Sequence, residues 1–167
     1  MASNRVVTYI DMNINSVEEY WNELIVPSAK KFQTEPSTPA LFHVAIDVWH
    51  LHDWVWHDQN PGQDGHGPAF KSYRQSLIKA CPELGWLRDI ADARKHRGLG
   101  RLPEIKGAEP HKVGGYATVL LVFTAEVLKF FLVLNDGSKE PADQVLRTAI
   151  EFWRRELQVK NLLSPYV

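Results

Sequence analysis

Apolar residues recur every three or four positions along most of the chain, which is the spacing of amphipathic helices that bury one face. The last of these segments shows the pattern most clearly, because Leu146, Ile150, Trp153 and Leu157 fall on one face. We therefore expect Trp153 and its neighbour Phe152 to anchor that helix in the core. The pattern predicts five helices, approximately over residues 15–33, 38–59, 69–80, 81–97 and 140–163.

Capping and breaking residues set the expected ends of these helices. Ser16 is suited to cap the first helix, which Pro27 then kinks or ends. Thr38 is the expected cap of the second helix, with Pro39 at its first position. The fourth helix is expected to begin at Pro82 and to finish at a Gly98 C-cap. Residues 98–115, rich in glycine and polar side chains, then read as a long loop.

A different pattern follows that loop, with β-branched and aromatic residues close together. The runs TVLLVFT (118–124) and LKFFLVL (128–134) predict two short antiparallel strands, and Asn135-Asp136-Gly137 is a turn signal. The alternative is one long buried helix, because the AEV link between the runs lacks a turn residue. The expected fold is mainly α: one domain over residues 1–167, a bundle of about five helices with a small antiparallel β-hairpin before the last helix.

Composition is that of a globular protein, with 44% hydrophobic and 23% charged residues and a net charge of −1. The single cysteine, Cys81, excludes an intramolecular disulfide, and no signal peptide is evident in MASNRVVTYIDMN. Glu126 and Lys129 interrupt the longest apolar stretch, residues 116–134, which favours a core segment over a membrane span. We therefore expect a cytoplasmic protein with no membrane partner.

The second predicted helix carries an unusual set of histidines in HVAIDVWHLHDWVWHD, residues 43–58. At 100° per residue, His43, Asp47, His50, Trp54 and His57 share a stripe roughly 80° wide, with His52 on the opposite side. Two structural interpretations are a stripe that faces solvent and a hydrogen-bonded seam between helices. The third interpretation is a metal-binding or catalytic site.

The fourth predicted helix offers a partner for such a site. Asp92 and His96 are separated by four positions, and Asp47 and His50 by three, so each pair lies on one helix face. Facing helices with aspartate and histidine form carboxylate–imidazole metal sites in bundles. We therefore predict Asp47, His50, Asp92 and His96 as ligands of a divalent metal, although the chain has neither HExxH nor CxxC.

Seven basic side chains gather between residues 88 and 112. Cations at the end of a helix are expected, because the helix dipole favours positive charge there. A second interpretation is contact with a phosphate-containing ligand or an RNA backbone by Arg94, Arg97 and Arg101.

Three segments together, HLHDWVWHD, CPELGWLRDIADARKH and LNDGSKEPADQVLRTAIEFW, resemble a group of small uncharacterised bacterial and phage-associated helical proteins over roughly residues 40–160. A looser likeness is to HEPN domains, helical bundles that often act as RNases and carry an arginine and a histidine with four to six residues between them. Here seven residues lie between Arg88 and His96, which departs from that pattern and puts the two about 80° apart on a helix. The two could still converge across a dimer.

The HEPN likeness implies catalytic roles for these two residues. His96 would act on the 2′-hydroxyl or the leaving group, and Arg88 would steady the phosphate charge. The sequence thus favours a site between the second and fourth helices, in a metal-dependent or HEPN-like phosphoesterase or RNase. The alternative is a non-catalytic interaction module that self-associates through its apolar hairpin.

Overall fold

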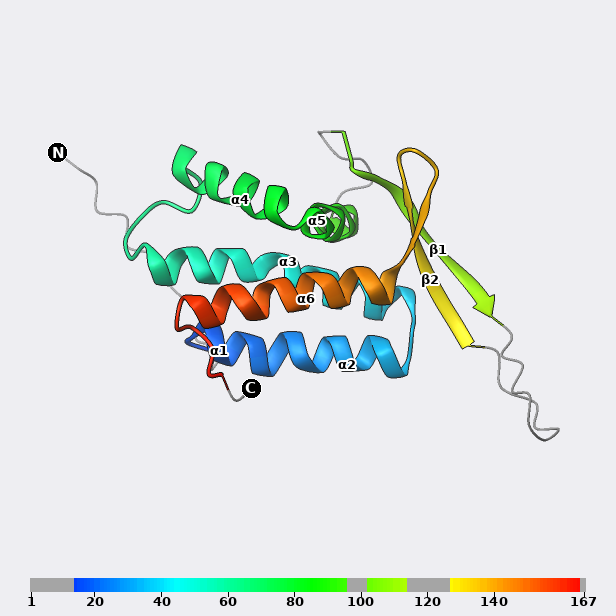
Figure 1. The fold of residues 1–167 in the computed structure, drawn as a ribbon, viewed down its shortest axis with the longest axis horizontal. Coiled ribbons are helices and arrows are strands. Elements are labelled where there is room, and N and C mark those ends of the chain that lie inside the picture. The colour runs from blue at the N-terminus through cyan, green and yellow to red at the C-terminus, as the bar shows by residue number, and fades with distance from the viewer. Residues whose placement is uncertain (1–13, 96–101, 114–126, 166–167) are drawn as a thin grey trace.

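The computed structural model describes residues 14–95, 102–113 and 127–165, which form a helical bundle with a small sheet at one end (Figure 1). The predicted mainly α fold, with a small antiparallel sheet before the last helix, is confirmed. In Figure 1, α2, α3 and α6 lie alongside one another, whereas α5 is seen end-on and crosses them. The elements are α1 (Val17–Tyr20), a π-helical turn (Trp21–Ile25), α2 (Val26–Thr34), α3 (Thr38–Gln59), α4 (Pro68–Ala80), α5 (Pro82–Lys95), β1 (Ile105–Val113), β2 (Val127–Leu134), β3 (Lys139–Pro141) and α6 (Ala142–Val159).

The first predicted helix is continuous through Pro27, because a π-helical turn directly precedes the proline. The backbone N–H of Val26 donates to the carbonyl of Trp21, five residues earlier. A proline ring normally collides with the carbonyl four residues before it, and the wider π turn relieves that crowding. Ser16 caps this helix as predicted, and its hydroxyl accepts the N–H of Glu19 at 3.1 Å.

Helix α3 is the central element and contacts α1, α2, α5 and α6. Its N-cap is Ser37, whose hydroxyl accepts the N–H of Ala40 at 3.3 Å. The prediction of Thr38 as the cap is therefore wrong by one residue. Ser37 has the extended backbone that a cap requires, and Thr38 is already the first helical residue. The helix ends at Gln59, as its sequence indicates.

Helix α6 buries the predicted apolar face. The side chain of Trp153 is fully buried, and its indole N–H donates to the carbonyl of Val48 on α3 at 3.0 Å. Trp153 is thus confirmed as a core anchor, whereas Phe152 is only partly buried and packs at the margin of the core. This contact ties the last helix to the central one.

The three strands form one antiparallel sheet in the order β1-β2-β3. Strand β2 matches the predicted strand 128–134, so the single long helix is excluded for this stretch. Its described partner is β1, in a register that runs from Ile105 opposite Leu134 to Val113 opposite Val127. Residues 105–113 were expected to form a loop, and that prediction is wrong. The predicted strand 118–124 and the Gly98 cap lie outside the described residues.

The turn between β2 and β3 is the predicted Asn-Asp-Gly turn. Gly137 has a φ of 90°, a conformation that other residues rarely adopt, and its N–H donates to the carbonyl of Leu134 at 3.0 Å. The strands then lead directly into α6. Among the described helices, none is long and apolar enough to cross a membrane.

Candidate functional site

The histidine stripe of α3 lies on the outward side of the helix. His43 and His57 are exposed, whereas Asp47, His50 and Trp54 are partly buried at the margins of neighbouring helices. His52, predicted to point the opposite way, is buried. The two ends of the stripe thus face solvent, whereas its middle lies against neighbouring helices, with the Trp54 ring 5.0 Å from the ring of Tyr20 on α1.

Asp47 is the most perturbed group of the stripe. Partial burial raises the pKa of its carboxyl group, opposed by a hydrogen bond from the Ser28 side chain and by the nearby charges of His43, His50 and Arg94. Ser28 belongs to α2 and Arg94 to α5, so Asp47 lies where three helices approach one another. A carboxyl group with a raised pKa near cations can donate or accept a proton in a reaction.

His50 is held in one orientation by its own helix. Its Nδ1 lies 3.0 Å from the carbonyl oxygen of Ile46, which can only accept a hydrogen bond. Nδ1 therefore carries the proton in the neutral ring, and the lone pair is on Nε2. This tautomer leaves Nε2 able to accept a proton or bind a metal.

The predicted metal ligands do not form a site within the part of the chain that the structure describes. No three described histidine, cysteine, aspartate or glutamate side chains are grouped so as to hold a metal ion. Asp47, His50 and Asp92 are among these described residues, and the three do not form such a group. His96, predicted both as a ligand and as a catalytic group, lies outside the described residues, as do Arg97 and Arg101.

His52 lies in an aromatic cluster between α3 and α4. Its ring is 4.2 Å from the Trp49 ring and 5.4 Å from the Phe70 ring, measured between centroids. Its Nδ1 contacts the carbonyl of Trp49, and its Nε2 lies 3.4 Å from the carboxylate of Asp53. Burial lowers the pKa of His52 to about 4, with Arg74 and His50 acting in the same direction, although Asp53 and the Trp49 carbonyl oppose it.

Stability is therefore expected to fall as the pH drops from about 6.5 to about 4. The unfolded chain binds a proton at His52 near pH 6.5, whereas the folded chain does so only near the folded-state pKa of about 4. Protonation of His52 thus favours unfolding, and it should lower the free energy of unfolding by about 3 kcal/mol across this window. Urea unfolding at several pH values should show this loss in the wild type and a smaller one in His52→Phe. Equal losses in both proteins would contradict the assignment.

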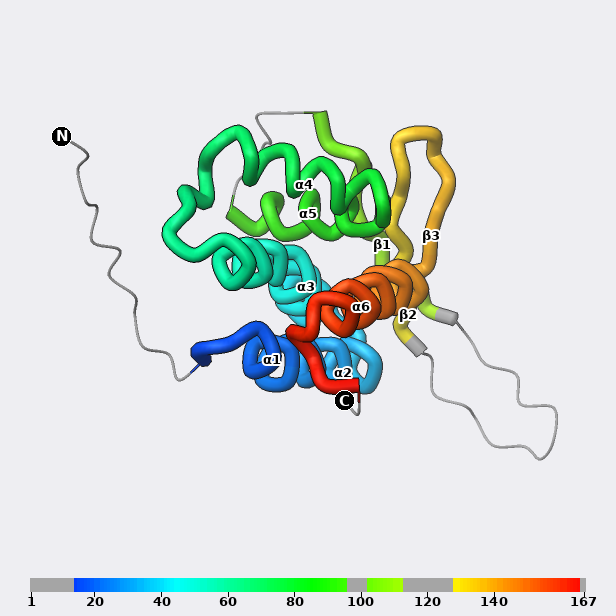
Figure 2. Tube along the Cα trace, turned by 60° about the vertical axis from the view of Figure 1, so that its left-hand side comes forward, coloured from blue at the N-terminus to red at the C-terminus, as the bar shows by residue number. Residues whose placement is uncertain are grey.

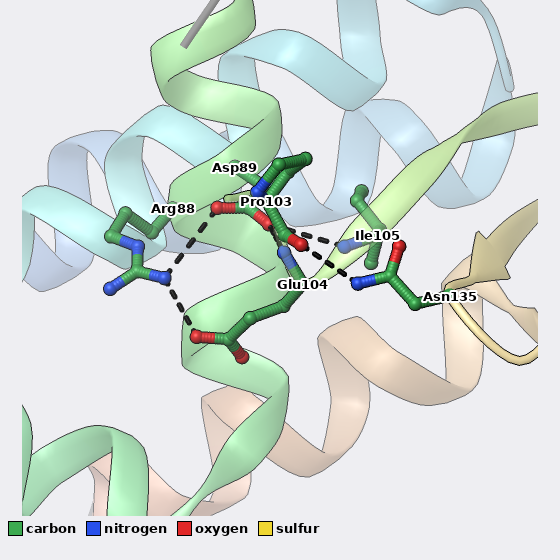
Figure 3. Close-up of polar contacts among 6 residues, drawn as sticks. All are labelled: Arg88, Asp89, Pro103, Glu104, Ile105 and Asn135. Carbon is green, nitrogen blue, oxygen red and sulfur yellow. Dashed lines mark hydrogen bonds and ion pairs between the residues drawn. The ribbon is translucent and has the colours of Figure 1, made fainter. Parts of the chain in front are cut away.

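Arg88 and Asp89 connect α5 to the segment that enters β1 (Figure 3). The Arg88 guanidinium donates to the carboxylate of Glu104 at 2.7 Å and lies 3.6 Å from the nearer carboxylate oxygen of Asp89. The other oxygen of Asp89 accepts the backbone N–H groups of Glu104 and of Ile105, the latter at 3.2 Å. Asp89 is 2% exposed, so these bonds are made away from water.

Asn135 completes this attachment from the turn that follows β2, at the same end of the sheet as Ile105. Its side-chain amide donates to the carbonyl of Pro103 at 2.8 Å, beside the Asp89 contacts (Figure 3). The segment 103–105 is thus held by α5 on one side and by the β2–β3 turn on the other. Arg88, predicted as a catalytic residue, is engaged by two carboxylates, which neutralise the charge that a phosphate would need.

A cleft of about 370 Å³ lies beside this attachment. Its walls are the first turns of α3, the middle of α5, and strands β1 and β2. The lining residues are Thr38, Leu41, Phe42, Asp89, Ile90, Ala93, Pro103, Ile105, Lys106, Gly107, Ala108 and Phe130.

The chemistry of the cleft is mainly apolar. Leu41, Ile90 and Phe130 are buried side chains of the core that line it, and Gly107 adds no side chain to its β1 wall. Lys106 is exposed and is the one cation among the lining residues. Such a surface is suited to holding an apolar group, with a positive charge close to it.

Sequence reasoning did not find the cleft. Asp89 precedes Asp92 by three positions on the same helix, and nothing in the sequence distinguishes a carboxylate that binds backbone N–H groups from a solvated one. Strand β1, which forms one wall of the cleft, lies within residues 98–115, which the sequence predicts as a loop. The adjacent Arg88 and Asp89, with Pro103 further along the chain, are the only sequence signal near this cleft. They do not indicate that Asp89 contacts the segment after Pro103.

Comparison with protein-family models, curated proteins and solved structures finds no match to this chain.

Proposed function

We propose that this protein is a binding module that takes up an apolar group of its ligand in the cleft between α3, α5 and β1. One observation carries the proposal: the cleft has a mainly apolar lining, and its β1 wall is fastened by the buried carboxylate of Asp89. Its volume of about 370 Å³ lies within the range of ligand pockets. Lys106 suits a ligand that also carries negative charge.

The fixed geometry of the β1 wall supports binding. A wall that moves freely would collapse onto an apolar cavity, whereas segment 103–105 is held by the Asp89 and Asn135 hydrogen bonds. A pre-formed cavity avoids the cost of ordering its walls when the ligand arrives. The engagement of Arg88 by Glu104 and Asp89 likewise favours a structural over a catalytic role for that arginine.

Anilinonaphthalene sulfonate (ANS) is a suitable probe, because it joins an apolar ring system to one negative charge. We expect saturable binding of one ANS per chain to the wild type, measured by fluorescence titration. Ala93→Trp should remove this binding, because Ala93 lines the cleft on the exposed side of α5 and a tryptophan would fill it. Ala69→Trp is the matched control, since Ala69 is exposed on α4 and does not line the cleft.

Unfolding curves should show that both variants remain folded, because ANS also binds partly unfolded proteins. Unchanged ANS affinity in folded Ala93→Trp would refute the cleft as the binding site. Equal loss in the Ala69→Trp control would also refute it.

A phosphoesterase or RNase, with or without a divalent metal, is the second candidate. The raised pKa of Asp47, with His43, His50 and Arg94 nearby, favours it, because these groups supply proton-transfer and anion-binding chemistry. We expect Asp47→Asn to abolish any RNA cleavage or saturable Zn²⁺ binding by the wild type. If the wild type neither cleaves labelled RNA nor binds Zn²⁺ in calorimetry, this candidate is refuted.

Self-association through the hairpin is a further part of the interaction hypothesis. Strand β1 is at one edge of the sheet, and its outer edge is the place where another strand would add. It contains Pro110, which has no N–H to donate, and the charged Lys106 and Lys112. These are features by which proteins discourage strand addition, so the helical surfaces are the better candidates for a protein contact.

A further inference from the structure

A second hollow lies between α2 and α6, on a different face from the cleft. The two helices lie side by side in both views (Figures 1 and 2). The groove between them has a volume of about 490 Å³. A smaller hollow of about 160 Å³ adjoins it near β2 and shares Phe32, Gln33 and Asp143 with it. Together they form one groove along the α2–α6 surface.

The floor of this groove is apolar. Phe32 and Leu146 are core residues whose edges reach it, and Ala29 and Ile150 are partly buried beside them. Val26 lies at one end and is 43% exposed, which is unusual for a large apolar side chain in this structure. A partner that covered the floor would remove this apolar surface from water.

Cations outnumber anions along the rim. The rim has four cations and two carboxylates. The cations are Lys30 of α2, Arg147 and Arg154 of α6, and Lys129 of β2, and the carboxylates are Asp143 and Glu151. Within the described chain, no ion pair involves any of these four cations. The Arg154 guanidinium instead lies 5.9 Å from the centre of the Trp21 ring. The rim therefore has positive charge that acidic groups of a partner would complement.

The length of the groove suits a helix. Its α6 wall extends from Asp143 to Arg154. At 1.5 Å per residue this span is roughly 16 Å, or about three helical turns. A helix of that length with one apolar face is the usual occupant of an apolar groove between two helices.

We propose that the α2–α6 groove docks an acidic amphipathic helix of a partner protein. The apolar floor would hold the helix's apolar residues, and the cationic rim would pair with its flanking carboxylates. RNA fits less well, because an apolar floor offers nothing to phosphates and Asp143 and Glu151 repel them. A second copy fits less well too, since the acidic helical turn around Glu18 buries its own Val17, Tyr20 and Trp21.

The test uses a stapled helical peptide of about fourteen residues, with leucines on one face and glutamates elsewhere. Fluorescence anisotropy of the labelled peptide should show saturable binding to the wild type. The double variant Lys30→Glu, Arg147→Glu should bind about tenfold more weakly, because attraction becomes repulsion on both walls. Lys31→Glu, Arg155→Glu changes the same helices by the same total charge outside the groove and should bind as the wild type does.

A peptide with lysine in place of glutamate should not bind. The proposal is overturned if the acidic peptide shows no saturable binding, if both double variants weaken it equally, or if the lysine peptide binds as well. If single-stranded RNA displaces the acidic peptide, the groove binds nucleic acid and the proposal is wrong. If sedimentation shows a wild-type dimer, and the double variant Lys30→Glu, Arg147→Glu is a monomer, the groove binds a second copy and the proposal is also wrong.

Discussion

Replacing Asp89 with alanine is expected to lower the free energy of unfolding by about 3–5 kcal/mol, one of the two largest effects expected in this protein. The carboxylate is 2% exposed and accepts the backbone N–H groups of Glu104 and Ile105. Alanine would leave both donors buried without their acceptor, and Arg88 would lose one of its two carboxylate neighbours. Urea unfolding followed by circular dichroism measures the loss.

Two further variants separate the causes. Asp89→Asn retains an acceptor oxygen but not the charge, so it should lose less stability than Asp89→Ala. Asp58→Ala removes an exposed aspartate from α3 and should change the stability by less than about 0.5 kcal/mol. An Asp89→Ala protein that unfolds at the wild-type urea concentration would show that the attachment of β1 to α5 contributes nothing.

Trp153→Ala is expected to cost about 3–5 kcal/mol as well, because it empties a large volume at the junction of α6 and α3. The indole is fully buried, and the truncation also removes the hydrogen bond to the Val48 carbonyl. Its neighbour Phe152 is partly buried, so Phe152→Ala should cost clearly less. Urea midpoints of the two variants give the comparison.

Trp153→Phe divides the effect of the tryptophan into its two parts. It keeps most of the apolar volume but not the indole N–H, so it should retain more stability than Trp153→Ala. If Phe152→Ala proved as costly as Trp153→Ala, the assignment of Trp153 as the main anchor of α6 would be wrong.

Helices were predictable here because each pairs an apolar face with a local boundary signal. Ser16, Pro39 and Pro82 mark starts that depend on backbone chemistry within one turn. The Thr38 cap was off by one residue because Ser37 and Thr38 are both suitable hydroxyl caps, and the backbone of Ser37 settles the choice. Local rules place an element well and its cap residue less well.

Strand β1 was not predictable, because its exposed position removes the usual strand pattern. Apart from Ile105, its described side chains are partly or fully exposed, and Gly107 and Pro110 are typical of loops. What makes it a strand is its pairing with β2, whose apolar run had a clear signal. The pairing is a long-range contact, which periodicity within one segment does not encode.

The site was predicted only in part for a similar reason. Helical spacing put Asp47 and His50 on the less buried side of α3 and His52 in the core, although the rings of His50 and His52 lie only 6.3 Å apart. Spacing on α5 does not show which aspartate accepts the backbone N–H groups at the start of β1. The predicted site therefore includes Asp92 and leaves out Asp89. The α2–α6 groove was also missed, because a groove depends on how far apart two helices pack.

The most direct test of the proposed cleft is the location of ANS on the protein, read from backbone amide NMR shifts during a titration. Binding in the cleft should move the amides of Lys106, Gly107 and Ala108 and that of Ala93 in α5. Those shifts should follow one saturation curve, and amides along α2 and α6 should stay in place. Shifts confined to the α2–α6 groove, or scattered without saturation over the whole chain, would contradict the account.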